Sequence, residues 1–236
     1  IYPVPPDASP QTIDWERFLG PAPKRAFSPE VFFRWRCWWE YSGGVATDLF
    51  VHLLTTLHEV MNVTAPVSVV SQGGLFKWKD GRTVPDLLES VFEYKEGFFA
   101  QMCVNLSNSS RAPGMVIYGE KGTLVMEPSK LIVTPEPEDL DIQRYGSTAW
   151  PKAMRDEYLK SRGDGNPRPP VPEVKEVPVE RGPGHAEYFV ESIRESKPSR
   201  ENATEGHAAA GAAHLANMAY REGRKLHWDF AANKVS

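Results

Sequence analysis

Asp48 and His52 lie four residues apart in a segment whose apolar residues recur every three or four positions. This spacing is typical of an amphipathic helix, so both side chains would lie on one face and could meet at one small molecule. A histidine titrates near neutral pH and can exchange a proton with a substrate, while an aspartate can accept hydrogen bonds from hydroxyl groups. The pair therefore predicts acid–base chemistry on a small polar substrate, with Asp48 and His52 as the candidate catalytic residues.

The same two residues also have a structural and a metal-binding interpretation. An aspartate in the first turn of a helix interacts favourably with the helix dipole, and a histidine one turn later is often only solvated. Spacing alone favours this structural interpretation. A catalytic zinc needs about three protein ligands, and His58, six residues after His52, would point elsewhere. We therefore predict no metal site.

An aromatic and basic run precedes this helix. It contains Trp35, Trp38 and Trp39 together with the three residues we take as candidate substrate-binding groups, Arg34, Arg36 and Tyr41. Aromatic faces stack on sugar rings and guanidinium groups bind hydroxyls or carboxylates, so the run could form a carbohydrate platform. Packing in a core or interface is the competing interpretation, and we favour it for the tryptophans.

The flanking segments predict the elements that hold these residues. Residues 45–61 predict a helix that packs on a core through Ala46, Leu49, Phe50, Leu53, Leu54, Leu57 and Val60. After Pro66 the period changes to two, which is typical of strands joined by tight turns, over 67–77, 88–94, 98–106, 115–119, 123–126 and 131–134. Two further helices, over 186–193 and 203–225, close the chain. We predict an α+β fold: an open, largely antiparallel mixed β-sheet with helices on one face.

The chain of 236 residues is long enough to bury a core without disulfides or metals, and we expect a single domain over residues 1–236. It would carry an extended lead-in over 1–30 and a proline-rich surface excursion over 135–183. The two cysteines, Cys37 and Cys103, lie far apart without metal-ligand spacing, which predicts neither a disulfide scaffold nor a zinc knuckle.

The charge and the hydropathy of the chain argue against two classes of binding partner, nucleic acids and membranes. The chain has 27 basic and 31 acidic side chains and a formal charge of −4, which argues against nucleic acid or an anionic membrane as the main partner. No apolar run approaches the roughly 20 residues that cross a bilayer. The first residue is Ile1 rather than methionine, so we expect a processed product or a piece of a longer polypeptide.

Dinucleotide binding needs a strand, a Gly-x-Gly-x-x-Gly turn and a helix, so that backbone amides receive the pyrophosphate. No segment of the sequence supplies this pattern, and Gly182-Pro183-Gly184 lacks the third glycine. A phosphate-binding loop and a Gly-x-Ser-x-Gly elbow are missing as well. The sequence therefore predicts no Rossmann domain in this chain.

Taken together, several motifs resemble the C-terminal half of the Gfo/Idh/MocA oxidoreductases, with the glycine pair, Asp48 and His52 as the most specific part. These motifs are Phe33–Arg36, Tyr41–His52, Lys79–Arg82, Val84–Asp86, Gly119–Thr123, Gly206-His207 and Trp228-Asp229. The resemblance covers nearly the whole chain. It implies an N-terminal Rossmann domain that holds NAD or NADP, followed by a substrate domain whose open sheet face mediates dimers or tetramers.

Carried over to this sequence, the resemblance implies that Asp48 orients a hydroxyl of a sugar or polyol and that His52 accepts its proton. The expected partners are therefore such a small-molecule substrate, a missing N-terminal Rossmann domain and further copies of the chain. We expect no NAD or NADP binding and no turnover by this chain alone. The sequence leaves open a non-catalytic carbohydrate-binding or assembly module, part of an NAD-dependent redox-assisted glycosidase, and a cytoplasmic or periplasmic location.

Overall fold

The computed structural model describes residues 3–109, 114–136, 146–161, 173–180 and 182–236. The chain divides into two compact units, one formed by Ile1–Ser110 with Gly184–Ser236 and the other by Arg111–Pro183. In the sequence, the second unit is therefore inserted between the two segments that form the first unit. Each unit is described on its own below.

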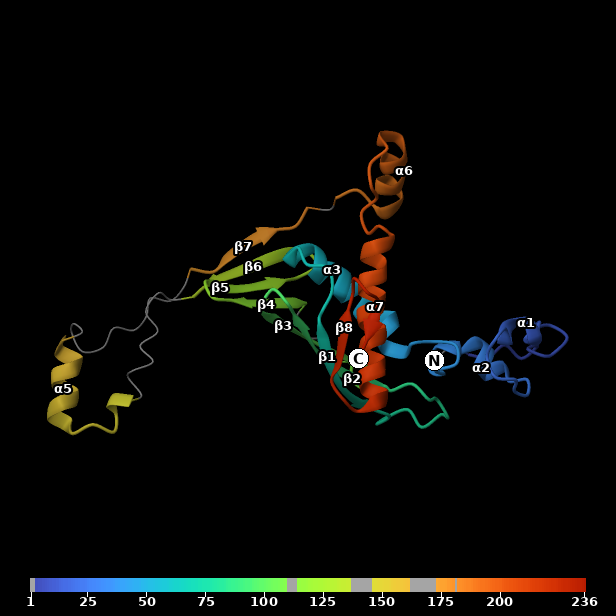
Figure 1. Ribbon diagram of the computed structural model, residues 1–236, viewed down its shortest axis with the longest axis horizontal. Helices are drawn as coiled ribbons and strands as arrows, with labels where there is room; N and C mark the ends of the chain where they lie inside the picture. The colour runs from blue at the N-terminus through green and yellow to red at the C-terminus, as the bar shows by residue number, and fades with distance from the viewer. Residues whose placement is uncertain (1–2, 110–113, 137–145, 162–172, 181) are drawn as a thin grey trace. The chain divides into compact units, whose positions relative to one another are not determined.

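The first unit is built on a five-stranded sheet with the order β3-β2-β1-β8-β9 (Figure 1). The strands are β1 (Ser68–Gly74), β2 (Leu87–Tyr94), β3 (Phe98–Asn105), β8 (Leu226–Asp229) and β9 (Lys234–Val235). Every pairing is antiparallel, and Val69 lies opposite Phe92 while Ser71 lies opposite Ser90. The C-terminal strand β8 thus pairs with β1, more than 150 residues earlier in the chain.

Two long helices, α3 (Val51–Met61) and α7 (Ala203–Glu222), supply the other side of the core. Both belong to the same unit, α7 contacts α3, β1 and β8, and the ribbon shows them beside the strands (Figure 1). Helix α7 is rich in alanine, which permits close approach, and Gly211 leaves no room for a Cβ atom beside the Trp228 ring. The core is dominated by fully buried side chains, among them Phe50, Leu54, Leu88, Phe92, Leu215 and Leu226.

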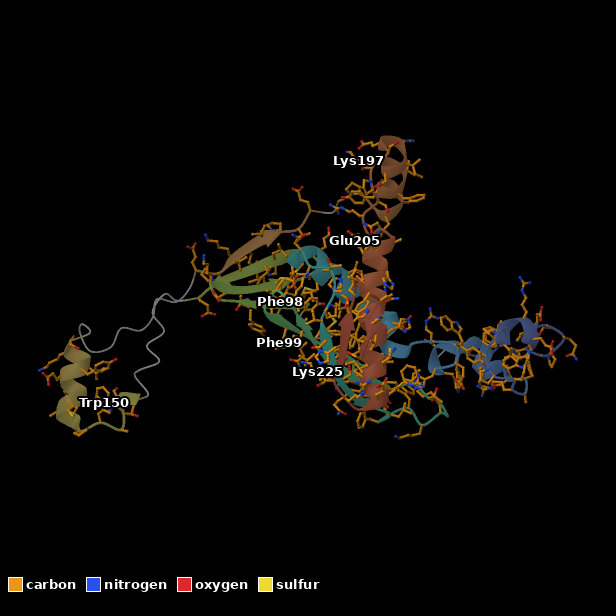
Figure 2. All side chains as sticks on the ribbon, viewed as in Figure 1. Phe98, Phe99, Trp150, Lys197, Glu205 and Lys225 are labelled. Carbon is orange, nitrogen blue, oxygen red and sulfur yellow. The ribbon has the colours of Figure 1, made fainter. Side chains whose placement is uncertain are left out.

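The alternate side chains of the sheet lie on its outer face. Val70 and Val91 pair across β1 and β2 and are 42% and 37% exposed, while Phe99 on β3 is 71% exposed. Its neighbour Phe98, labelled with Phe99 in Figure 2, stacks on the buried Tyr94 at 4.6 Å between ring centroids. In the part of the chain that the structure describes, the outer face is therefore solvent-accessible and partly apolar.

The first 40 residues contribute short helices rather than a sheet. These are α1 (Trp15–Leu19), α2 (Pro29–Phe33) and the single 3₁₀ turn η1 (Trp35–Cys37). Asp14 caps α1 and Ser28 caps α2, each through a side-chain oxygen that accepts a backbone N–H. Phe18 lies between the rings of Phe32 and Tyr41, at 4.9 Å from each. This aromatic cluster organises the predicted lead-in.

The second unit contains a four-stranded antiparallel sheet of order β4-β5-β6-β7 and the helix α5. Its elements are β4 (Met115–Gly119), β5 (Gly122–Met126), β6 (Lys130–Pro135), α5 (Lys152–Ser161) and β7 (Lys175–Pro178). Much of the predicted excursion over 135–183 lies outside the described residues.

The predicted α+β class with antiparallel strands is confirmed, although the strands form two sheets. The helix from Ala203 is also confirmed, as is the helix over 186–193, which is α6 (His185–Glu195). One detail was wrong: Leu49, Leu53 and Val60 are 39%, 41% and 43% exposed rather than packed on the core. Residues 46–50 form a π turn, η2 (Ala46–Phe50). In the helix that follows, the buried side chains are Leu54, Leu57 and His58, so Leu53 and Val60 lie at the edge of the buried face.

Both cysteines are free. Among the described helices, none is both long and apolar enough to cross a membrane.

A histidine is buried where α3 ends. The His58 side chain lies 2.9 Å from the Tyr94 hydroxyl and is 7% exposed. Burial lowers the pKa of His58 to about 4, because the imidazolium form would lose its hydration. The folded protein therefore keeps this ring neutral at pH values where an unfolded chain would protonate it.

We expect this difference to make the fold weaker in mild acid. A histidine in an unfolded chain titrates near 6.5, so the contribution of His58 is complete above that pH and is lost as the pH falls toward about 4. The loss at pH 5 is on the order of 2 kcal/mol. Urea unfolding at pH 7 and pH 5 measures the loss in the free energy of unfolding for the wild-type protein and for His58→Gln. The variant should lose much less stability between these two pH values. Equal losses for the two proteins would show that His58 does not set this dependence.

Candidate functional site

The turn Gly43-Gly44 fixes where the π turn η2 begins. Gly44 has φ +60°, and a Cβ atom there would come within 2.9 Å of Val84 Cβ. At Gly43 a Cβ atom would overlap the Thr47 side chain. From the other side, the Asn217 amide on α7 donates to the Gly43 carbonyl at 2.6 Å. A residue 174 positions away thus holds the backbone that leads to Asp48.

The π turn then places the candidate catalytic residues on the surface. Ala46 and Phe50 are fully buried and anchor the turn, while Asp48 and, one turn later on α3, His52 are exposed. Short π segments are rare and occur frequently at functional sites. The structure therefore keeps both candidates accessible, as acid–base chemistry on a bound molecule requires.

Asp48 forms an ion pair with Arg36. The Arg36 Nε donates to Asp48 Oδ1 at 3.1 Å, and both side chains are about half exposed. Such an exposed pair contributes at most about 1 kcal/mol to stability. Its main consequence is that Arg36 fixes the orientation of the Asp48 carboxylate. Asp48 Oδ2 and the two ring nitrogens of His52 make no hydrogen bond to the described residues.

The remaining candidates have different surroundings. Arg34 caps the end of α2 and is half-buried, and the Arg36 guanidinium lies over the Trp35 ring at 4.3 Å. Tyr41 stacks on Phe18, and its buried hydroxyl has no hydrogen-bond partner among the described residues. The structure thus brings Arg36 to Asp48, whereas no described hydrogen bond joins Tyr41 to either of them.

The tryptophans of this run differ in exposure. Trp38 is 9% exposed and belongs to the core, whereas Trp35 is 36% exposed. Trp39 faces the Arg221 guanidinium at 5.3 Å. Packing, the interpretation favoured from the sequence, is thus what the structure gives for Trp38.

A cavity of about 280 Å³ lies next to the Arg36 side chain. Its lining residues are Phe33, Arg34, Arg36, Cys37, Trp78, Arg82 and Leu106. Two segments meet here, because the Cys37 carbonyl accepts the backbone N–H groups of Thr83 and Val84 at 2.9 and 3.3 Å. These bonds bring Arg82 to the aromatic and basic run.

A buried carboxylate shapes the loop that carries Trp78. Asp86 is fully buried, and its oxygens accept the backbone N–H groups of Phe76, Lys77 and Trp78 at 2.8 to 3.2 Å. Burial alone would raise the pKa of Asp86, but these three donors and the nearby Arg82 outweigh it and leave the pKa lowered. Asp86 therefore stays ionised and fixes one wall of the cavity.

A second ion pair lies at the same loop. Arg82 donates from Nε and Nη2 to the two oxygens of Asp80 at 2.8 and 2.7 Å. The Arg82 hydrogen bonds lower the pKa of Asp80 to about 2. Burial raises the pKa of the Cys37 thiol, and the charges of Arg82 and Arg34 oppose that shift while Asp80 adds to it.

Among the residues that the structure describes, no metal site is found, and a second, larger hollow does not include Asp48 or His52. No group of three or more histidine, cysteine, aspartate or glutamate side chains is gathered there as a metal site. A larger hollow of about 560 Å³ lies over the lead-in, between Pro5 and Phe33, and is lined by neither Asp48 nor His52.

Several contributors to this site were missed from the residues alone. Arg82 and Asp86 were named only as parts of motifs in the family resemblance, and Trp78 and Asn217 were not singled out. Asn217 lies among alanines on α7, and a polar residue on the buried face of a helix was the available clue.

A comparison with protein-family models identifies the class of protein to which this chain belongs. The family model described as "Oxidoreductase family, C-terminal alpha/beta domain", that of Gfo/Idh/MocA, matches residues 13–228. The chain therefore belongs to the Gfo/Idh/MocA oxidoreductase family. No curated protein matches the sequence.

Solved structures share the fold at low sequence identity. An NAD-binding protein from Listeria innocua is 18% identical with a TM-score of 0.55, over 82% of this chain and 54% of that chain. Levoglucosan dehydrogenase in complex with NADH and levoglucosan is 14% identical with a TM-score of 0.55, over 82% and 52%. UDP-N-acetylglucosamine 3-dehydrogenase from Acidithiobacillus ferrooxidans is 15% identical with a TM-score of 0.52, over 89% and 58%. The chain spans about half the length of these proteins.

The packing of the glycine turn that precedes Asp48 can be tested by its effect on stability. We expect Gly44→Ala to destabilise the fold by more than about 1 kcal/mol, because it adds both backbone strain at φ +60° and a clash with Val84. Gly223→Ala is the matched control, since Gly223 has φ +65° and a Cβ atom there would meet nothing within 4 Å. Urea unfolding gives both free energies, and equal losses would mean that the contact with Val84 is unimportant.

Proposed function

We propose that this chain is the substrate-binding and oligomerisation part of an NAD(P)-dependent oxidoreductase that acts on a sugar, polyol or glycoside. The observation that carries the proposal is the accessible pair Asp48 and His52, set one turn apart at the start of the helix that packs on the core. Membership of the oxidoreductase family supports the class of reaction.

Each side chain has a free atom for its role. Asp48 Oδ1 is held by Arg36, and Oδ2 is available to accept the hydrogen bond of a substrate hydroxyl. His52 is exposed and has no described hydrogen-bond partner, so its imidazole can accept the proton of the reacting hydroxyl. Asp48 then orients the substrate, and His52 acts as the general base.

The cofactor would be held outside this chain. Dinucleotide cradles need a parallel strand–turn–helix unit, whereas every strand pairing among the described residues is antiparallel. A nicotinamide supplies a hydride acceptor when it is bound. We propose that a Rossmann domain elsewhere in the full-length protein holds it next to Asp48 and His52.

Two of the similar structures support a carbohydrate as the substrate class. One is named a levoglucosan dehydrogenase and the other a UDP-N-acetylglucosamine 3-dehydrogenase. An exposed aromatic side chain close to the site, Trp35, offers a face on which a sugar ring can stack.

The outer sheet face is proposed as the contact between copies of the chain. It carries the exposed cross-strand pair Val70 and Val91 and the exposed Phe99. An exposed, partly apolar surface of this kind is typical of an interaction site.

The catalytic assignment predicts a loss of turnover. In the full-length protein, we expect His52→Ala to lower kcat by about 10²–10⁴-fold with KM changed only a few-fold, because a general base acts mainly in the transition state. Steady-state kinetics with NAD(P) and the sugar or polyol substrate measures both constants. His214→Ala, which removes an exposed histidine from α7, is the control and should keep wild-type kinetics. Wild-type turnover of His52→Ala would refute the assignment and favour a non-catalytic binding module.

If the outer sheet face joins copies of the chain, one charged residue introduced there should dissociate the oligomer. Val91→Lys should convert the oligomer into smaller species, because a lysine ammonium at the centre of a partly apolar contact would lose its hydration. Val190→Lys changes a similarly exposed valine on α6, 42% against 37%, and should leave the mass unchanged. Light scattering after size exclusion gives the masses. A monomeric wild-type protein would count against the proposal.

A further inference from the structure

The cavity beside the Arg36–Asp48 pair has an unusual lining. Three of its seven lining residues are arginines, Arg34, Arg36 and Arg82, and none of the described lining residues is acidic. Asp48 and Asp80 pair with two of these arginines but are not part of the lining. At about 280 Å³ the cavity lies just below the range that encloses a whole drug-sized ligand, so it is sized for one group of a larger one.

Two of the guanidinium groups keep donors for a ligand. An arginine has five N–H donors. Arg36 uses only Nε for Asp48, and Arg82 uses Nε and Nη2 for Asp80. The two Nη atoms of Arg36 and Nη1 of Arg82 make no hydrogen bond to a described residue. Paired N–H groups of this kind match the two oxygens of a carboxylate or phosphate.

The surroundings strengthen an interaction with an anion. The Arg82 side chain is 7% exposed and its Cζ lies 5.4 Å from the centre of the Trp78 ring. Phe33 and Leu106 line the cavity with apolar side chains. Charges interact more strongly where water is partly excluded. Asp80 and Asp86 neutralise part of the positive charge, so the remaining donors orient an anion as well as attract it.

We infer that this cavity binds a carboxylate or phosphate group of the substrate. The inference rests on the proposed function and narrows it: the substrate is an acidic sugar or a sugar phosphate rather than a neutral sugar. Arg36 connects the two sites, since its Nε holds Asp48 at 3.1 Å while its Nη atoms serve the cavity. One ligand can therefore place its anion in the cavity and a hydroxyl at Asp48.

Binding measurements on the full-length protein test the ligand class. The probes are glucuronate, glucose 6-phosphate and glucose, titrated by calorimetry without cofactor. We expect at least one anion to bind roughly tenfold or more tightly than glucose, because hydrogen bonds to charged groups are the strong ones. Preference for glucuronate identifies a carboxylate ligand, and preference for glucose 6-phosphate identifies a phosphate ligand.

Matched variants test the place of binding. Arg34→Gln and Arg36→Gln should each weaken binding of the anion roughly fivefold or more, and weaken it by a larger factor than they weaken glucose binding. Arg200→Gln is the control, because Arg200 lies over the Tyr188 ring at 4.5 Å much as Arg36 lies over Trp35 but does not line the cavity. Arg82 is left intact, since its removal would leave Asp80 without its ion-pair partner.

The two free cysteines provide a local readout that needs no turnover. Cys37 lines the cavity, while Cys103 on β3 lies beside Glu89. The ratio of Cys37 alkylation to Cys103 alkylation should therefore be higher with the anionic reagent iodoacetate than with the neutral reagent iodoacetamide. Saturating anion should slow alkylation of Cys37 and leave Cys103 unaffected, as peptide mass spectrometry would measure.

The outcomes separate this inference from the proposed function. Glucose binding as tightly as both anions would overturn the inference, and so would anion binding that neither arginine variant weakens and that leaves Cys37 unprotected. Either result would leave the assignment of His52 standing, because that assignment is judged by turnover alone. Conversely, an active His52→Ala enzyme with an intact anion site would remove the catalytic role and keep the cavity as a binding site.

Discussion

The packing of the turn Gly43-Gly44 is the constraint on which the site depends. The Val84 side chain leaves no space for a Cβ atom at Gly44, and Asn217 on α7 holds the Gly43 carbonyl. The turn is therefore fixed by a loop of the sheet on one side and by the last long helix on the other. Since the π turn starts immediately after it, the positions of Asp48 and His52 are set by contacts between segments far apart in the sequence.

The polar groups of the site are arranged around this rigid start. Arg36 reaches Asp48 from the preceding run, and Asp86 holds the loop that brings Trp78 to the cavity. Exposed ion pairs contribute little to stability, whereas the buried Asp86 satisfies three backbone donors. The buried groups thus support the fold, and the exposed groups remain available to a ligand. This division is expected where a binding site is built on a packed scaffold.

Local pattern was enough to predict much of this architecture. Period-two alternation identified β2 and β3, and the fold class followed from the tight turns between strands. Strand β8 was missed, because four residues next to a C-terminal turn carry too short a pattern, although they pair with β1. The exposure of Leu49 and Leu53 was also missed, since the apolar residues of this segment span a wide arc of the helix and only part of that arc meets the core. Asp48, His52 and Arg36 could be chosen by chemistry, but the contribution of Arg82 depends on hydrogen bonds between two distant loops.

We propose that this chain supplies the groups that orient and deprotonate the substrate, while the cofactor is held elsewhere. A crystal structure of the full-length protein with an inactive cofactor analogue and substrate tests this claim most directly. We expect the reacting hydroxyl to lie within about 3.2 Å of a His52 ring nitrogen, or one water away, with Asp48 Oδ2 accepting a hydrogen bond from the same ligand. A substrate seated beyond the reach of both side chains would contradict the account.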